Sequence, residues 1–271
     1  MNHHGWRDDA RAADELSSLA RWLGDEARDL AVLGEGNVSM RLDAERMLVK
    51  ASGSALAAAT PDTLVEVRLR PLLELLDTAD ADDEDVQRVL LGSRADGEEA
   101  QPSVEALLHA VSLTDGGASV VAHTHPQSVN AIVCSDRAPA LVAGALFPDQ
   151  IVVLGREQIL VPYVDPGLDL GRAVRAAVRD YRSRWGDRPR AIYLANHGFV
   201  ALGDSADEAR RITVMADKVA RVLRDTLAIG EPRYLGDEFA DRIHTRPDEM
   251  LRRRVLDGRS GPASFAVVAP R

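Results

Sequence analysis

The sequence is poor in cysteine and aromatic residues, and it has no long uninterrupted apolar segment. Its 271 residues include one cysteine, Cys134, so no internal disulfide can form, as is typical of a reducing compartment. Aromatic residues make up 4% of the chain, so a core must consist mainly of alanine, valine and leucine. No apolar run reaches membrane-spanning length, and residues 1–9 lack the apolar core of a signal peptide. We therefore expect a cytoplasmic protein without membrane contact.

The chain also has fewer basic than acidic residues. Lysine and arginine number 33 against 43 acidic residues, a net charge of -10, and the two signs are interspersed. This balance argues against a nucleic-acid groove, which needs a basic face. The length suits one large domain with a modest appendage. We expect the main domain over residues 1–228, and a helical extension over 229–271 that packs on the domain or on a neighbouring subunit.

Residues 120–126 combine an apolar run, typical of a buried strand, with two histidines at its end. Side chains at positions i and i+2 of a strand point to the same face, so His123 and His125 can direct two imidazoles at one point. A metal site needs that arrangement. On this stretch alone, histidines that bind nearby carbonyls explain the sequence equally well. Pro126 predicts a helix over 127–134, with Cys134 as a small core residue.

A third histidine has the same context. An apolar strand is predicted over residues 191–194 and is followed by Asn196, His197 and Gly198. The glycine leaves room beside the imidazole. Three histidines with one open coordination position are a known catalytic zinc arrangement.

Two small polar loops and one acidic residue accompany these histidines. Residues 34–37 contain two glycines, which let a backbone approach a ligand closely. Residues 51–54 offer amides and hydroxyls that can hold an anion. Ser103 is the expected N-cap of a helix, and Glu105 lies in its first turn. Local sequence alone favours Glu105 as a helix-start acid over a catalytic role.

Apolar spacing predicts the other elements. Helices are expected over residues 8–33, 168–185 and 205–227. Short strands are expected over residues 138–146, 150–154 and 158–161.

The polar motifs together resemble the class II aldolase/adducin family, over about residues 8–226. They occur in that family's order and spacing: Gly36-Asn37-Val38-Ser39, Ala51-Ser52-Gly53, Pro102-Ser103-Val104-Glu105, His123-Thr124-His125 and Asn196-His197-Gly198. Residues 67–73 and 102–109 are similar to the aldolase module of bifunctional rhamnulose-phosphate aldolase/lactaldehyde dehydrogenase proteins. The resemblance implies an α/β fold, an α/β/α three-layer sandwich with a central mixed, mainly antiparallel sheet. It also implies a homotetramer with active sites between subunits.

The same resemblance assigns roles by motif. His123, His125 and His197 match the ligands of a divalent metal, most often Zn²⁺. Glu105 matches the family's catalytic carboxylate. The substrate-binding loops correspond to Asn37, Ser52, Gly53 and Ser103.

This chain departs from the fuculose-phosphate aldolases at three points. Gly34 and Val104 stand where those enzymes have hydroxyl residues, so two phosphate contacts are missing. In those enzymes a tyrosine of a neighbouring subunit also serves as the general acid. The corresponding stretch of this chain, residues 138–147, contains no tyrosine. Four tyrosines remain as substitutes: Tyr163, Tyr181, Tyr193 and Tyr234.

The resemblance predicts a divalent-metal-dependent aldolase that cleaves a ketose or ketose phosphate to dihydroxyacetone (phosphate) and an aldehyde. A decarboxylase of a 3-oxo sugar acid is an alternative, because it needs the same metal-stabilised enolate. A non-catalytic assembly module like the adducin head is another. Retention of the three histidines and Glu105 argues against that last alternative.

Overall fold

A single mixed sheet forms the centre of the protein. The computed structural model describes residues 8–95 and 97–247, and within them seven strands lie in the order β3-β2-β1-β4-β7-β6-β5. Only β5 and β6 are parallel, and the other neighbours are antiparallel. The strands are β1 (Asn37–Arg41), β2 (Arg46–Lys50), β3 (Leu64–Arg68), β4 (Val120–Thr124), β5 (Ile159–Val161), β6 (Ala191–Leu194) and β7 (Gly198–Gly203).

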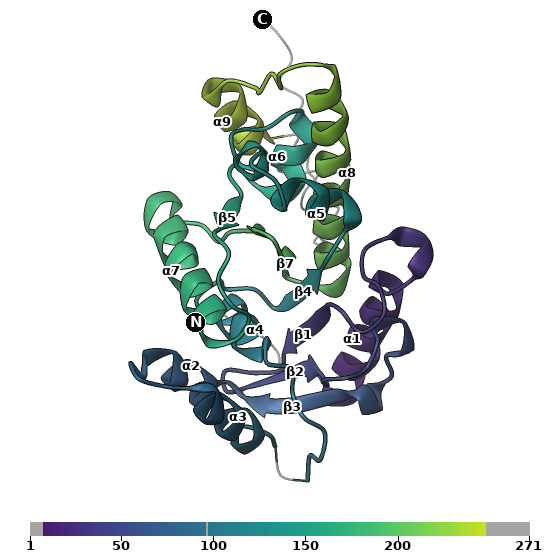
Figure 1. Cartoon of the computed structure of the whole chain (residues 1–271), viewed down its shortest axis with the longest axis vertical. Helices are drawn as coiled ribbons and strands as arrows, with labels where there is room; N and C mark the ends of the chain where they lie inside the picture. Colours follow the sequence, from purple (N-terminus) through teal and green to yellow (C-terminus); the bar gives the residue numbers. More distant parts are fainter. Residues whose placement is uncertain (1–7, 96, 248–271) are drawn as a thin grey trace, which may run out of the picture.

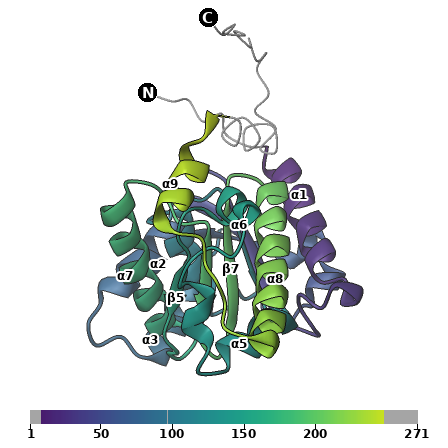
Figure 2. The same ribbon diagram turned by 90° about the horizontal axis from the view of Figure 1, so that it is seen from above.

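Helices cover both faces of this sheet, which confirms the three-layer α/β/α sandwich (Figures 1 and 2). One face carries α1 (Asp9–Leu23), α5 (Gln127–Val133) and α8 (Ala206–Ile229), with α6 (Pro148–Leu154) against α8. The other face carries α2 (Leu69–Asp77), α3 (Asp83–Gly92), α4 (Ala106–Leu113) and α7 (Leu168–Trp185).

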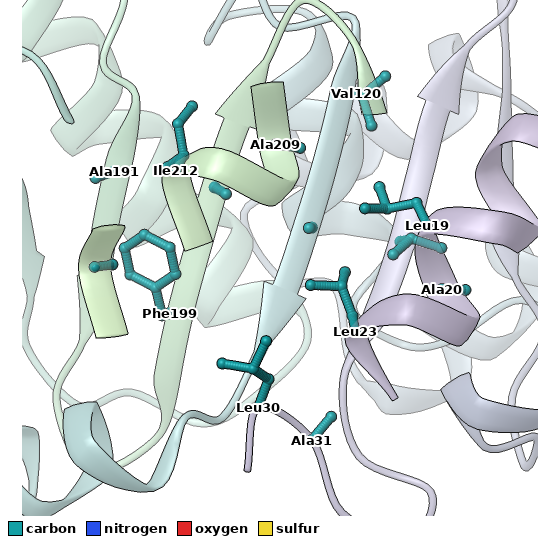
Figure 3. Close-up of a cluster of buried hydrophobic side chains, with 14 of the residues drawn as sticks. Leu19, Ala20, Leu23, Leu30, Ala31, Val120, Ala191, Phe199, Ala209 and Ile212 are labelled. Carbon is teal, nitrogen blue, oxygen red and sulfur yellow. The ribbon is translucent and has the colours of Figure 1, made fainter. Parts of the chain in front are cut away.

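Alternating side chains divide the strands between two cores. Val38 and Met40 of β1 pack towards α1 and α8, whereas Met47 and Val49 of β2 pack towards α2 and α4. Figure 3 shows part of the first core, where Phe199 of β7 lies near Ile212 of α8 and Ala191 of β6. Both cores are built mainly from alanine, valine and leucine, as the low aromatic content requires.

The central strands bring three distant segments to one edge of the sheet. Asn37, at the start of β1, pairs with His123, near the end of β4. His123 also pairs with Val200, near the start of β7. Because these strands are antiparallel neighbours, the segments before β1, after β4 and before β7 meet at this edge.

The first helix is shorter than the sequence predicts. It ends at Leu23, and a 3₁₀ turn (Glu26–Arg28) follows instead of a continuous helix to residue 33. Gly24 lies against a neighbouring turn, so closely that a Cβ atom there would be 2.2 Å from the Ala57 nitrogen. Leu30 is buried as the apolar pattern implies, but from an irregular segment.

Two predicted strands are wrong. Residues 138–141 form a 3₁₀ turn (Ala138–Leu141), and residues 150–154 belong to α6. Short apolar runs fit a strand and a buried helix equally, and here Pro148 begins a helix. The predictions for α7 and α8 are confirmed, with α7 covering residues 168–185.

Two local predictions are also wrong. Cys134 follows the last residue of α5 and is exposed rather than part of the core. The N-cap of α4 is Glu105, not Ser103. Ser103 still supports this helix start, because its Oγ accepts a hydrogen bond from the Glu105 nitrogen at 3.3 Å.

After α8 the chain returns to the domain. Helix α9 (Asp237–Thr245) packs on α6, where Ile243 is buried with Ile151 and Val152. Residues 248–271 lie outside the described residues, so the division between 1–228 and 229–271 stays a prediction. No helix of the described ranges combines the length and apolarity that crossing a bilayer requires.

The packing at Gly24 gives the first testable prediction. We expect Gly24→Ala to lower the free energy of unfolding by about 1–3 kcal/mol, because the added methyl group overlaps backbone atoms. Gly92→Ala is the matched control, since nothing lies within 4 Å of its Cβ position. Urea unfolding of both variants measures the difference, and equal stabilities would contradict the account of how α1 ends.

Candidate metal centre

Three imidazole rings converge at the shared edge of the sheet. β4 carries His123, His125 follows directly after the last residue of β4, and the turn between β6 and β7 supplies His197. One ligand atom from each ring lies within 4.8 Å of the other two. The Nε2 atoms of His123 and His125 are 3.0 Å apart. The i, i+2 spacing at the end of β4 thus brings His123 and His125 together, and the sheet order adds His197.

A carboxylate at the start of helix α4 completes the cluster. Glu105 stands at the start of α4, and its Oε1 lies 3.4 Å from His123 Nε2 and 3.1 Å from His197 Nε2. Its side chain is only 12% exposed. Three nitrogens and one carboxylate oxygen therefore face a common point that is largely shielded from water.

The far nitrogens of two rings are held by other groups. His123 Nδ1 donates to the Phe199 carbonyl at 3.0 Å, and His125 Nδ1 donates to Glu35 Oε2 at 3.1 Å. A neutral ring that donates from Nδ1 presents a lone pair at Nε2. The Nε2 atoms of both rings are therefore available as ligands. His197 Nδ1 is buried, and no hydrogen-bond partner for it lies among the described residues.

The electrostatics of the cluster call for a cation. Burial alone raises the pKa of Glu105, but the charges and hydrogen bonds of His123 and His197 hold that pKa well below its usual range. Burial opposes a charge on His123, yet Glu105 raises the pKa of this ring. Burial, then His123 and His197, lower the pKa of His125 to about 3. A proton on His123 balances Glu105 but satisfies few of the four converging atoms, whereas a divalent cation fits them all.

Gly198 makes the close approach of the rings possible. A Cβ atom at this position would lie 2.7 Å from His125 Cδ2 and 2.7 Å from the Thr124 carbonyl oxygen. The preceding Asn196 has a positive φ of 54°, which asparagine tolerates better than most residues. The Asn-His-Gly sequence therefore suits this turn at each position.

Asn37 lies beside Glu105 and is buried. Its Nδ2 donates to Glu105 Oε2 at 2.6 Å and to Ser103 Oγ at 3.5 Å. Its Oδ1 is hydrogen-bonded to His109 Nε2. Both polar atoms of the Asn37 amide are thus hydrogen-bonded, and its Nδ2 orients the Glu105 carboxylate.

His109 extends this network, which the sequence did not reveal. It is fully buried on α4, one turn after Glu105, and its Nδ1 is 2.6 Å from Ser39 Oγ. Because Asn37 Oδ1 can only accept, His109 Nε2 carries the proton and the serine hydroxyl donates to Nδ1. Burial, then the charge of His123, lower the pKa of His109 to about 3, so the ring is neutral.

The second polar loop lies next to this network. The Ser52 nitrogen donates to the Gln101 carbonyl at 2.8 Å, which sets the loop beside the segment leading to Ser103. Ser52 and Gly53 are exposed, and Gly53 has a φ of 78°. Lys50 Nζ donates to the Ala51 carbonyl at 3.0 Å, and burial lowers its pKa against the opposing charge of Glu105.

The four tyrosines differ sharply in environment. Tyr181 and Tyr193 are buried, and Tyr234 donates its hydroxyl to the Ala140 carbonyl at 2.7 Å. Tyr163 follows β5 and is 55% exposed, and its hydroxyl is 3.1 Å from an Asp165 oxygen. Tyr163 is therefore the most accessible of the four.

Comparisons with known proteins show what this chain is similar to. The family described as "Class II Aldolase and Adducin N-terminal domain" matches residues 14–223. The "Uncharacterized oxidoreductase YuxG" of Bacillus subtilis (strain 168) is 27% identical over 79% of this chain, which spans only 30% of that relative's length. The "3-oxo-tetronate 4-phosphate decarboxylase" of Haemophilus influenzae (strain ATCC 51907 / DSM 11121 / KW20 / Rd) is 27% identical, over 81% of this chain and 90% of that protein.

A solved structure shares the fold. It is the N-terminal class II aldolase domain of a conserved protein from Thermoplasma acidophilum, with 26% identity and a TM-score of 0.62. The likeness covers 83% of this chain and 97% of that one.

The contacts of Gly198 predict that Gly198→Ala weakens Zn²⁺ binding by at least about tenfold, because the methyl group must displace His125. Gly92→Ala is the matched control, since nothing lies within 4 Å of its Cβ position. Competition with a chromophoric chelator measures both affinities. Unchanged binding by Gly198→Ala would contradict the close packing of the rings.

The buried His109 predicts a pH-dependent stability. Its folded-state pKa of about 3 lies below the unfolded value of 6.5, so the unfolded chain binds an extra proton between them. Stability is therefore lost as pH falls below about 6.5, by about 2 kcal/mol at pH 5 from this group. We expect His109→Gln to lose that part of the pH dependence, measured by urea unfolding at pH 7 and pH 5. The same pH dependence in both proteins would refute the assignment.

Proposed function

Since the chain belongs to the class II aldolase and adducin family, we propose that it is a metal-dependent carbon–carbon lyase acting on a sugar or sugar phosphate. His123, His125 and His197 hold the divalent metal, and three imidazoles are a known ligand set for catalytic Zn²⁺. The observation that carries this proposal is the convergence of three Nε2 atoms and the Glu105 carboxylate. A non-catalytic assembly module would not require such a cluster.

Among such reactions, aldol cleavage suits the site best. The reaction begins when a base removes the proton of a substrate hydroxyl, and the carbon–carbon bond then breaks. The Glu105 carboxylate faces the point where the imidazoles converge, and from there it can accept the proton of a substrate hydroxyl. A divalent metal bound at the histidines supplies Lewis-acid stabilisation of the negative charge that develops on substrate oxygens.

The neighbouring groups hold the base and the substrate. Asn37 orients Glu105 through the 2.6 Å hydrogen bond, so positioning is its first role. The exposed loop of Ser52 and Gly53 offers backbone amides and a hydroxyl to substrate oxygens or a phosphate. Ser103 adds a hydroxyl next to Asn37.

Decarboxylation of a 3-oxo sugar acid is the second candidate. Two observations favour it: the similarity to the 3-oxo-tetronate 4-phosphate decarboxylase along 90% of that protein, and the absence of tyrosine from residues 138–147. Loss of CO₂ needs no base to remove a hydroxyl proton. The same histidines would serve, and the proton that replaces CO₂ on carbon would come from solvent.

The assembly and location stay predictions. We propose a homotetramer with sites between subunits, which would let a neighbouring chain supply the acid that completes the reaction. A cytoplasmic location fits the single cysteine.

A substrate panel tests the proposal. Zn²⁺-loaded protein is incubated with ketoses, ketose phosphates and 3-oxo sugar acids, while aldehyde and CO₂ release are followed separately. We expect aldehyde release, and a loss of about 10²–10⁴-fold in kcat for Glu105→Gln with its metal retained. CO₂ release alone would favour the second candidate.

The double variant His123→Ala with His125→Ala is the control for the metal. It should bind no Zn²⁺ while keeping its fold, as judged by circular dichroism. Metal retained by this variant would contradict the ligand assignment. A wild-type protein that binds metal but releases neither product would contradict the lyase proposal.

A further inference from the structure

Glu35 links a loop to the far side of the candidate metal centre. It lies in the segment between the Glu26–Arg28 turn and β1, with its side chain 32% exposed. Its Oε2 accepts a hydrogen bond from His125 Nδ1 at 3.1 Å, and its Oε1 accepts one from the Val32 nitrogen at 2.6 Å. Because Nδ1 lies across the ring from Nε2, this carboxylate contacts His125 on the side away from Glu105.

Backbone contacts hold the same segment against the histidine. The His125 nitrogen donates to the Leu30 carbonyl at 2.8 Å, and the Gln127 nitrogen donates to the Asp29 carbonyl at 3.1 Å. Residues 29–35 are therefore tied to residues 125–127 at three points. This attachment fixes where the Glu35 carboxylate stands relative to the imidazole.

The conformation of the loop is unfavourable without such contacts. Asp29 and Leu33 both have positive φ values, 53° and 54°, which residues other than glycine rarely adopt. Leu33 is also 84% exposed, so its side chain contributes little to packing. The Glu35 nitrogen donates back to the Val32 carbonyl at 3.2 Å and closes a tight turn around Leu33. The turn is maintained by the residue that contacts the histidine.

We propose that Glu35 is a positioning residue for the metal: its carboxylate fixes the orientation and tautomer of His125 so that Nε2 presents a lone pair. This inference rests on the proposed metal site. A carboxylate on the outer nitrogen of a histidine ligand strengthens metal binding in other proteins. His123 Nδ1 donates its hydrogen bond to a neutral backbone carbonyl instead. The Glu35 carboxylate is therefore the more basic of the two acceptors.

Metal affinity tests the proposal without reference to catalysis. Zn²⁺ affinity is measured by chelator competition for wild type, Glu35→Ala and Glu35→Gln. We expect Glu35→Ala to bind about 10–100-fold more weakly, with a changed visible absorption spectrum of the Co²⁺-substituted protein. Glu35→Gln keeps a hydrogen-bond acceptor without the charge, so its Zn²⁺ affinity should lie between those of the wild type and Glu35→Ala. The matched control is Glu26→Ala, which removes an exposed carboxylate from the turn that precedes this segment and should bind Zn²⁺ as the wild type does.

Urea unfolding of the metal-free proteins separates positioning from stability. Glu35→Gln should unfold as the wild type does and yet bind Zn²⁺ more weakly. Wild-type Zn²⁺ affinity and Co²⁺ spectra in both Glu35 variants would overturn the inference while leaving the metal site intact. A wild-type protein without Zn²⁺ affinity would instead overturn the proposed function. If Glu35→Ala fails to fold, Glu35→Gln decides the question alone.

Discussion

The fold and the site depend on one constraint: three imidazole nitrogens and a carboxylate oxygen face each other at the edge of a sheet. Such an arrangement is costly unless positive charge balances it, because charged and polar atoms are removed from water. The antiparallel order of β1, β4 and β7 makes the convergence possible, since it brings three distant segments to one edge. Gly198 then permits the contact distances.

Supporting residues surround this cluster on two sides. From α4 and β1, His109 and Asn37 hold Glu105, and the neutral state of the buried His109 keeps an additional charge out of the interior. From the loop before β1, Glu35 holds His125. The site is therefore oriented from both sides, and rigid placement of this kind favours a group that acts as ligand or base.

Local periodicity accounts for what the sequence predicted well. The i, i+2 spacing of His123 and His125 and the matching context of His197 required no knowledge of the fold, and the three-layer architecture came from the family resemblance. The wrong or missing predictions lie where contacts between residues far apart in the sequence determine the structure. Helix α1 ends at Leu23, where Gly24 packs against Ala57, and α6 forms where an apolar run is ambiguous. The partners of Glu35 and His109 lie 90 and 70 or more residues away in sequence, so local patterns could not reveal them.

The central claim is that one divalent metal is bound by these three histidines. X-ray absorption spectroscopy at the zinc edge of the loaded wild-type protein tests it most directly. The account predicts three imidazole nitrogens at about 2.0–2.1 Å, with the remaining coordination from oxygen. A sulfur ligand, which would implicate the exposed Cys134, or fewer than three imidazoles would contradict it.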